Sequence, residues 1–156
     1  MTETELALDE NSPATYVVPQ RRLFNIKAIV FAAFFGGVLA AGTILAINYY
    51  RLGMRRSAIA ALVVSFSIML GLCVLEYKAE MMPIEKIMIL NLFILAVIYA
   101  VASQLQGEMI RMHVAQGGDV FRVWWANGIG ILCFFVNLLI LAVVLVLMNQ
   151  WLPTSN

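Results

Sequence analysis

The polar side chains that could do chemistry are few, and several of them fall in one stretch around residue 110. Gln106 and His113 are seven residues apart, so a helix places them on one face. Glu108 and Arg111 are three apart and can pair on a helix surface. Together with two residues near position 50, they predict a polar cluster that binds a lipid headgroup or a protein partner; a solvated helix end is the alternative. The cluster comprises Asn48, Arg51, Gln106, Glu108, Arg111 and His113.

Metal and catalytic chemistry have little support in this sequence. His113 is the single histidine, and the two cysteines, Cys73 and Cys133, stand alone inside apolar runs. A zinc site needs about four Cys or His ligands at short spacings, so no metal site is predicted. No ionisable residue lies deep in an apolar run, which argues against a proton relay or an intramembrane protease. We therefore expect no cofactor and no enzymatic activity.

Four apolar runs separated by short charged breaks dominate the rest of the chain. The chain is 63% hydrophobic and 12% charged, and its mean hydropathy is +0.92. A bilayer core of ~30 Å takes ~20 apolar helical residues to cross. The sequence therefore predicts an all-α integral membrane protein, with four transmembrane helices arranged as two helical hairpins. The spans fall at about residues 28–50, 57–75, 85–107 and 123–148.

The domain organisation follows from these runs. Residues 1–22 are polar and acidic and predict a disordered tail, residues 23–152 form the bundle, and residues 153–156 are a short C-terminal tail. The third helix is expected to continue from Ile84 to Ala115, since no helix breaker precedes Gly117. An even number of crossings would leave both termini on the same side of the membrane.

Small residues in the first run predict close helix packing. Their spacing of four positions would form one stripe, against which another helix of the same chain or of a second protomer can lie. The stripe consists of Ala33, Gly36, Gly37, Ala40 and Ala41. Three asparagines inside the runs predict hydrogen bonds between helices or, alternatively, the lining of a solute path: Asn91, Asn127 and Asn137.

The basic residues do not choose an orientation under this four-span scheme. Cytoplasmic loops of membrane proteins carry the excess of Lys and Arg. One side would hold Arg21, Arg22, Lys27, Lys78 and Lys86, and the other would hold Arg51, Arg55, Arg56, Arg111 and Arg122. With five residues on each side, the sequence leaves the orientation open.

Short motifs in this chain resemble those of small bacterial four-span membrane proteins that have no assigned activity. The resemblance covers about residues 31–135 and rests on Phe35-Gly36-Gly37, Asn48, Leu52-Gly53, Gln106, His113 and Gly117-Gly118. It implies a bacterial inner-membrane location and the two-hairpin layout, and it brings no activity.

The function that the sequence favours is that of a non-enzymatic interaction or accessory subunit in the membrane. Its expected partners are the lipid bilayer and another membrane protein or a second copy of itself, as a homo-oligomer. A net charge of +1 without a basic stretch gives no support for nucleic-acid binding. The alternative is a small oligomeric channel or carrier for a neutral or weakly polar solute, lined by Asn48, Asn91 and Asn127.

Overall fold

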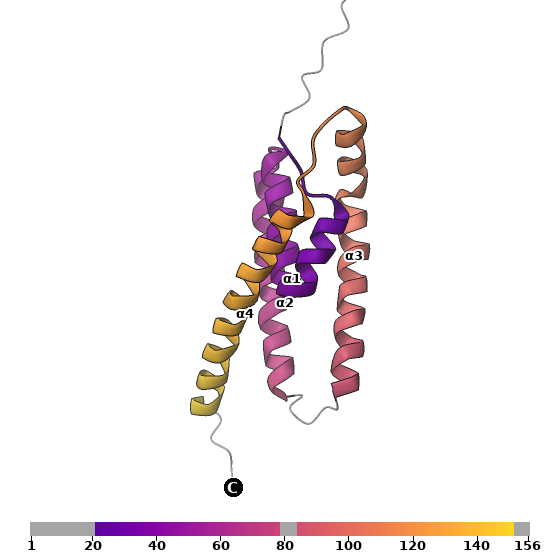
Figure 1. The fold of residues 1–156 in the computed structure, drawn as a ribbon. Coiled ribbons are helices and arrows are strands. Elements are labelled where there is room, and N and C mark those ends of the chain that lie inside the picture. The colour runs from indigo at the N-terminus through magenta and orange to yellow at the C-terminus, as the bar shows by residue number, and fades with distance from the viewer. Residues whose placement is uncertain (1–20, 79–83, 152–156) are drawn as a thin grey trace, which may run out of the picture.

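The computed structural model describes residues 21–78 and 84–151, and the fold of this part is all-helical (Figure 1). Its elements are α1 (Ile26–Arg51), α2 (Arg55–Lys78), α3 (Ile84–Ala115) and α4 (Val123–Trp151). Most of the predicted acidic tail, the 79–83 link and the 153–156 tail lie outside the described residues.

All four helices are long and apolar enough to cross a membrane, as the sequence predicted. The third begins and ends where its pattern indicated, at Ile84 and Ala115. Gly53 and Gly117 follow α1 and α3 with φ of 82°, a left-handed conformation that glycine adopts at little cost. These glycines fix the sites at which the chain turns.

The first helix folds back on itself at Gly37. This residue has φ 63° and ψ −153°, a backbone conformation essentially restricted to glycine. A straight helix would separate residues 24 and 48 by about 36 Å. Instead, the backbone N–H of Phe24 donates to Oδ1 of Asn48 at 2.8 Å. Residues 26–36 and 38–51 therefore form two antiparallel half-helices, which we name the α1 hairpin.

The α1 hairpin occupies the centre of the bundle, and the other three helices surround it (Figure 1). In its most apolar stretch 56% of the residues are buried, compared with 22% in α2 and 6% in each of α3 and α4. The second half of the α1 hairpin packs along α2. The second predicted hairpin is not formed, because α3 and α4 both pack on α1 and not on each other.

The described chain begins and ends at opposite ends of the bundle. Leu23 forms backbone hydrogen bonds with Asp119 and Phe121, immediately before α4 begins, and α4 then runs to Trp151 at the far end (Figure 1). The cause is the turn at Gly37, which returns α1 to the end where it started. The expectation that both termini lie on one side of a membrane depends on α1 being a crossing helix, and it stays a prediction.

The predicted small residues allow the α1 hairpin to pack closely within the chain. Ala33, Gly36, Ala40 and Ala41 are buried, but the break at Gly37 prevents them from forming one continuous stripe. A Cβ on Gly36 would lie 2.5 Å from the carbonyl oxygen of Gly130 and 2.7 Å from Cβ of Ala40. Gly36 thus faces both α4 and the other half of its own hairpin.

Candidate functional site

A buried pair of amide side chains closes the α1 hairpin. Asn48, on its second half, accepts from the N–H of Phe24 and donates from Nδ2 to the carbonyl oxygen of Phe24 at 2.9 Å. The same Nδ2 donates to Oε1 of Gln106 on α3 at 2.8 Å. Nε2 of Gln106 then donates to the carbonyl oxygen of Leu45 at 2.9 Å. We name Asn48 and Gln106 the amide latch.

The amide latch has a clear physical cause. Phe24 precedes α1, so its peptide groups have no partners within a helix, and an unpaired buried peptide group is costly. Asn48 and Gln106 have exposed fractions of only 0% and 1%. Because the latch amides bond each other and the backbone, they hold three segments together and cannot line an open path.

A second set of contacts seals the same end of the bundle. The rings of Phe24 and Phe121 stack with centroids 4.6 Å apart, and the guanidinium of Arg51 lies 4.5 Å from the centre of the Phe121 ring. Nη1 of Arg51 also donates to the carbonyl oxygen of Arg22 at 2.8 Å. Arg51 therefore connects the segment before α1 to the segment before α4.

The remaining members of the predicted polar cluster lie apart from the latch. His113 is buried against Gly118 in the loop after α3, with Nε2 3.3 Å from the carbonyl oxygen of Asp119. Glu108 and Arg111 form an exposed ion pair with a shortest distance of 2.9 Å. The structure thus brings together Asn48 and Gln106 but not all six predicted residues. Glu108 and Arg111 instead lie on an exposed part of α3, as in the alternative interpretation of a solvated helix end.

A separate opening, lined mainly by apolar residues and by two asparagines, lies at the tip of the α1 hairpin. A cavity of about 670 Å³ and a recess of about 110 Å³ share four lining residues: Gly37, Asn91, Ile94 and Asn137. Asn91 comes from α3 and Asn137 from α4, so two helices that do not contact each other present amides to one space. Sγ of Cys73 lies 3.9 Å from Oδ1 of Asn137, within sulfur hydrogen-bonding reach.

Asn127 does not belong to this opening. Its Oδ1 is buried and has no hydrogen-bond partner among the described residues. It is absent from the lining of the cavity and of the recess at the hairpin tip. Of the three intramembrane asparagines predicted from the sequence, Asn91 and Asn137 therefore share a site and Asn127 lies elsewhere.

Sequence reasoning missed Phe24 and Phe121 as parts of the sealed end and Gly37 as the break in α1. The Gly36-Gly37 pair was the available signal, since adjacent glycines interrupt helices. Its position inside the apolar run at residues 28–50 made a membrane-spanning helix the more natural interpretation. The contact partners of Phe24 depend on the fold and leave no local signal.

Comparisons with known proteins add no identity to these sites. Among the described residues, no group of three or more His, Cys, Asp or Glu side chains is arranged to hold a metal ion. The resemblance to small bacterial membrane proteins stays a prediction, because no family model, curated protein or solved structure matches this chain.

Proposed function

We propose that the chain lies in a membrane with three crossing helices, α2, α3 and α4, and that the α1 hairpin enters only halfway. The eleven residues 26–36 of its first half extend about 16 Å, roughly half of a ~30 Å hydrocarbon core. Non-helical backbone at such depth is tolerated where it is buried in protein or lines a water-filled cavity. The turn at Gly37 lines a recess between α2, α3 and α4, which fits the second condition.

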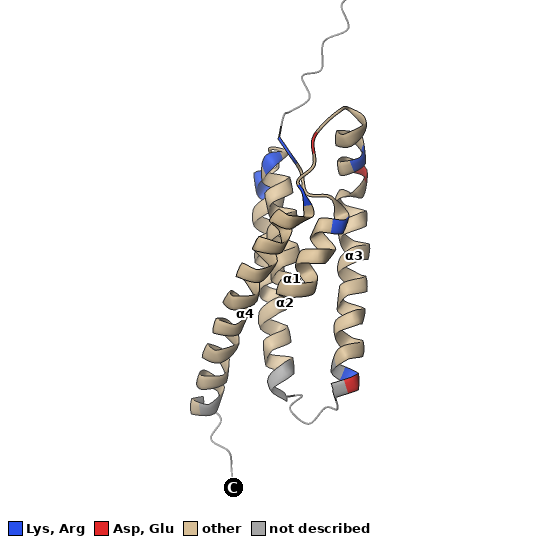
Figure 2. Ribbon diagram, in the orientation of Figure 1, with Lys and Arg blue, Asp and Glu red and all other residues tan. Residues whose placement is uncertain are grey.

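The distribution of basic residues supports this arrangement. If α1 returns to its starting side, eight of the ten Lys and Arg residues lie at one end of the bundle and two at the other. The two are Lys78 at the end of α2 and Lys86 in the first turn of α3. Figure 2 shows Lys and Arg gathered at the end where α1 and α2 begin. The equal division of basic residues in the four-span scheme is thus replaced by an excess at one end. We assign that end, which holds Arg21, Arg22 and Lys27, to the cytoplasm. We propose a bacterial inner membrane as the location.

Reporter fusions test the proposed topology. Alkaline phosphatase joined after Asn156 is expected to be active, because the C-terminus lies outside, whereas green fluorescent protein joined before Met1 is expected to fluoresce in the cytoplasm. The control is phosphatase joined after Gly117, which should be inactive. Reporters that place Met1 and Asn156 in the same compartment would restore the four-span scheme.

Within this membrane frame, we propose that the protein is a non-enzymatic interaction subunit. The observation that carries this role is the pair Asn91 and Asn137 at the hairpin tip. Polar side chains in hydrocarbon usually face protein or water. Asn91 is exposed in the isolated chain, and among the described helices α3 packs only on α1. A transmembrane segment of another subunit would supply hydrogen bonds to these amides and cover the uncovered faces of α3 and α4.

Association in mild detergent tests this role. The native chain is expected to purify as a complex larger than one 17.3 kDa protomer, with itself or with another membrane protein. The double variant Asn91→Leu/Asn137→Leu should run as a folded monomer. Gln104→Leu, on an exposed part of α3 outside the opening, is the matched control and should leave the complex intact. A native chain that is strictly monomeric in lipid nanodiscs contradicts the proposal.

A channel or carrier is the second candidate, since Asn91 and Asn137 present amides to one opening at the hairpin tip. The amide latch and the buried half-helices argue against it, because they fill the other half of the bundle. Proteoliposomes that contain the native chain should therefore pass small polar solutes no faster than empty liposomes. A flux abolished by Asn91→Leu would favour transport.

A further inference from the structure

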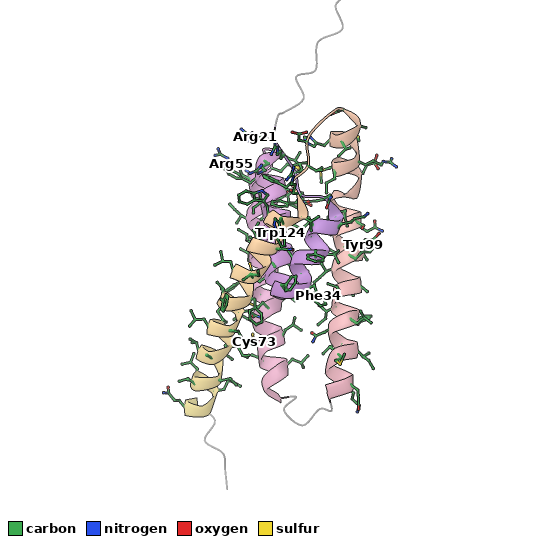
Figure 3. All side chains as sticks on the ribbon, in the orientation of Figure 1. Arg21, Phe34, Arg55, Cys73, Tyr99 and Trp124 are labelled. Carbon is green, nitrogen blue, oxygen red and sulfur yellow. The ribbon has the colours of Figure 1, made fainter. Side chains whose placement is uncertain are left out.

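A large cavity lies at the basic end, between the second half of the α1 hairpin and α2. Its volume is about 1010 Å³, and it is an open groove that the function proposed above does not use. Four arginines line its mouth: Arg21, Arg22, Arg51 and Arg55. Figure 3 shows Arg21 and Arg55 at this end, one before α1 and the other at the start of α2.

The arginines at the mouth carry more positive charge than the described residues neutralise. Arg22 pairs with Asp119 at 3.4 Å, and both side chains are largely exposed. Arg51 uses one nitrogen for the carbonyl oxygen of Arg22 and retains other donors. No acidic side chain of the described ranges lies within ion-pair distance of Arg21, Arg51 or Arg55. The mouth therefore favours an anion, and arginine matches phosphate in two-pronged geometry.

The wall of the groove is apolar below the arginines. Ile47 on α1 and Ile59 and Leu62 on α2 line it, and the two α2 residues are 63% and 43% exposed. Leu62 lies seven residues after Arg55, about 10 Å further along the helix. A ligand that fits both parts has a negatively charged head and a hydrocarbon chain.

We propose that this groove binds an anionic phospholipid, with its phosphate at Arg21, Arg51 and Arg55 and one acyl chain along Ile47, Ile59 and Leu62. Basic pockets between membrane helices bind such headgroups. The site rests on the proposed insertion into a bilayer, but it requires neither a partner subunit nor the Asn91–Asn137 opening.

Native mass spectrometry of the detergent-purified full chain measures this binding directly. Phosphatidylglycerol is expected to bind at least tenfold more tightly than phosphatidylcholine. The variant Arg21→Gln/Arg55→Gln should lose that preference by tenfold or more, since neither side chain has a hydrogen bond or ion pair in the described structure. The matched control Arg56→Gln/Arg111→Gln removes the same amount of charge outside the groove and should keep the preference for phosphatidylglycerol.

Further measurements separate this lipid from other occupants. Glycerol 1-phosphate and inorganic phosphate should not compete at millimolar concentration, because they lack the acyl chain; effective competition would overturn the lipid assignment. If both double variants lose the preference for phosphatidylglycerol equally, the effect comes from general surface charge, and the lipid assignment is wrong. If lipid binds only after residues 2–12 are deleted, the acidic tail is the occupant and the proposal is wrong. Correct reporter topology without lipid preference would refute this site alone.

Discussion

The substitution Asn48→Leu is expected to cause the largest loss of stability of any exchange of similar size in this chain. It removes the partner of three buried groups: the N–H of Phe24, the carbonyl oxygen of Phe24 and Oε1 of Gln106. Each unpaired buried group costs ~1–3 kcal/mol, so the free energy of unfolding should fall by about 3 kcal/mol or more. The loss is measured by denaturant titration of the detergent-solubilised protein.

A graded series of substitutions shows whether the loss of stability comes from the amide latch or simply from replacing a polar side chain. Gln106→Leu leaves Asn48 bound to Phe24 but removes the partner of one Asn48 N–H and of the Leu45 carbonyl oxygen, so it should cost about 1–3 kcal/mol, less than Asn48→Leu. Asn91→Leu is the matched control, because it makes the same change at an exposed amide and should leave monomer stability nearly unchanged. Equal stability of the Asn48 and Asn91 variants would show that the latch does not hold the α1 hairpin closed.

Gly37→Ala is the second substitution with a large expected effect. A Cβ at this position would meet no atom within 4 Å, so steric crowding is not the cause. The cause is the backbone conformation, φ 63° and ψ −153°, which L-residues avoid at a cost of ~1–3 kcal/mol. We expect the variant to lose about that much stability and to show a lower thermal unfolding temperature.

The matched control for Gly37 is Gly71→Ala in α2. Gly71 also has open space around its Cβ position, but it has an ordinary helical φ, so alanine should be neutral or slightly stabilising there. The topology reporters add a second readout. If Gly37→Ala is fully stable and Met1 moves to the outer compartment, α1 has become a straight crossing helix, and the turn is not obligatory.

Much of the secondary structure follows from the sequence because each signal is local. The apolar runs identify four helices, and the glycines at 53 and 117 mark where two of them end. The path of α1 is not local in this sense. Ala33, Gly36 and Ala40 have the same spacing in a straight helix and in a folded one. Only the partners across the fold, Gly130 and Phe24, distinguish the two arrangements.

The predicted polar cluster shows the same division. Asn48 and Gln106 were recognisable as polar residues that need partners, since an amide in an apolar setting is costly. That they bond each other and Phe24, while Glu108 and Arg111 face outward, depends on which face of α3 meets α1. Spacing along one helix cannot fix its rotation about its own axis.

By itself, the sequence determined that most of this chain forms apolar helices long enough to cross a membrane, because hydropathy and helix length act over consecutive residues. The tertiary structure alone decided that α1 turns back at Gly37, that the described chain begins and ends at opposite ends of the bundle, and that Asn48 meets Gln106. These outcomes depend on contacts between residues 24 or more positions apart. Such contacts are selected by packing and hydrogen bonding in three dimensions, and they leave no periodic mark in the chain.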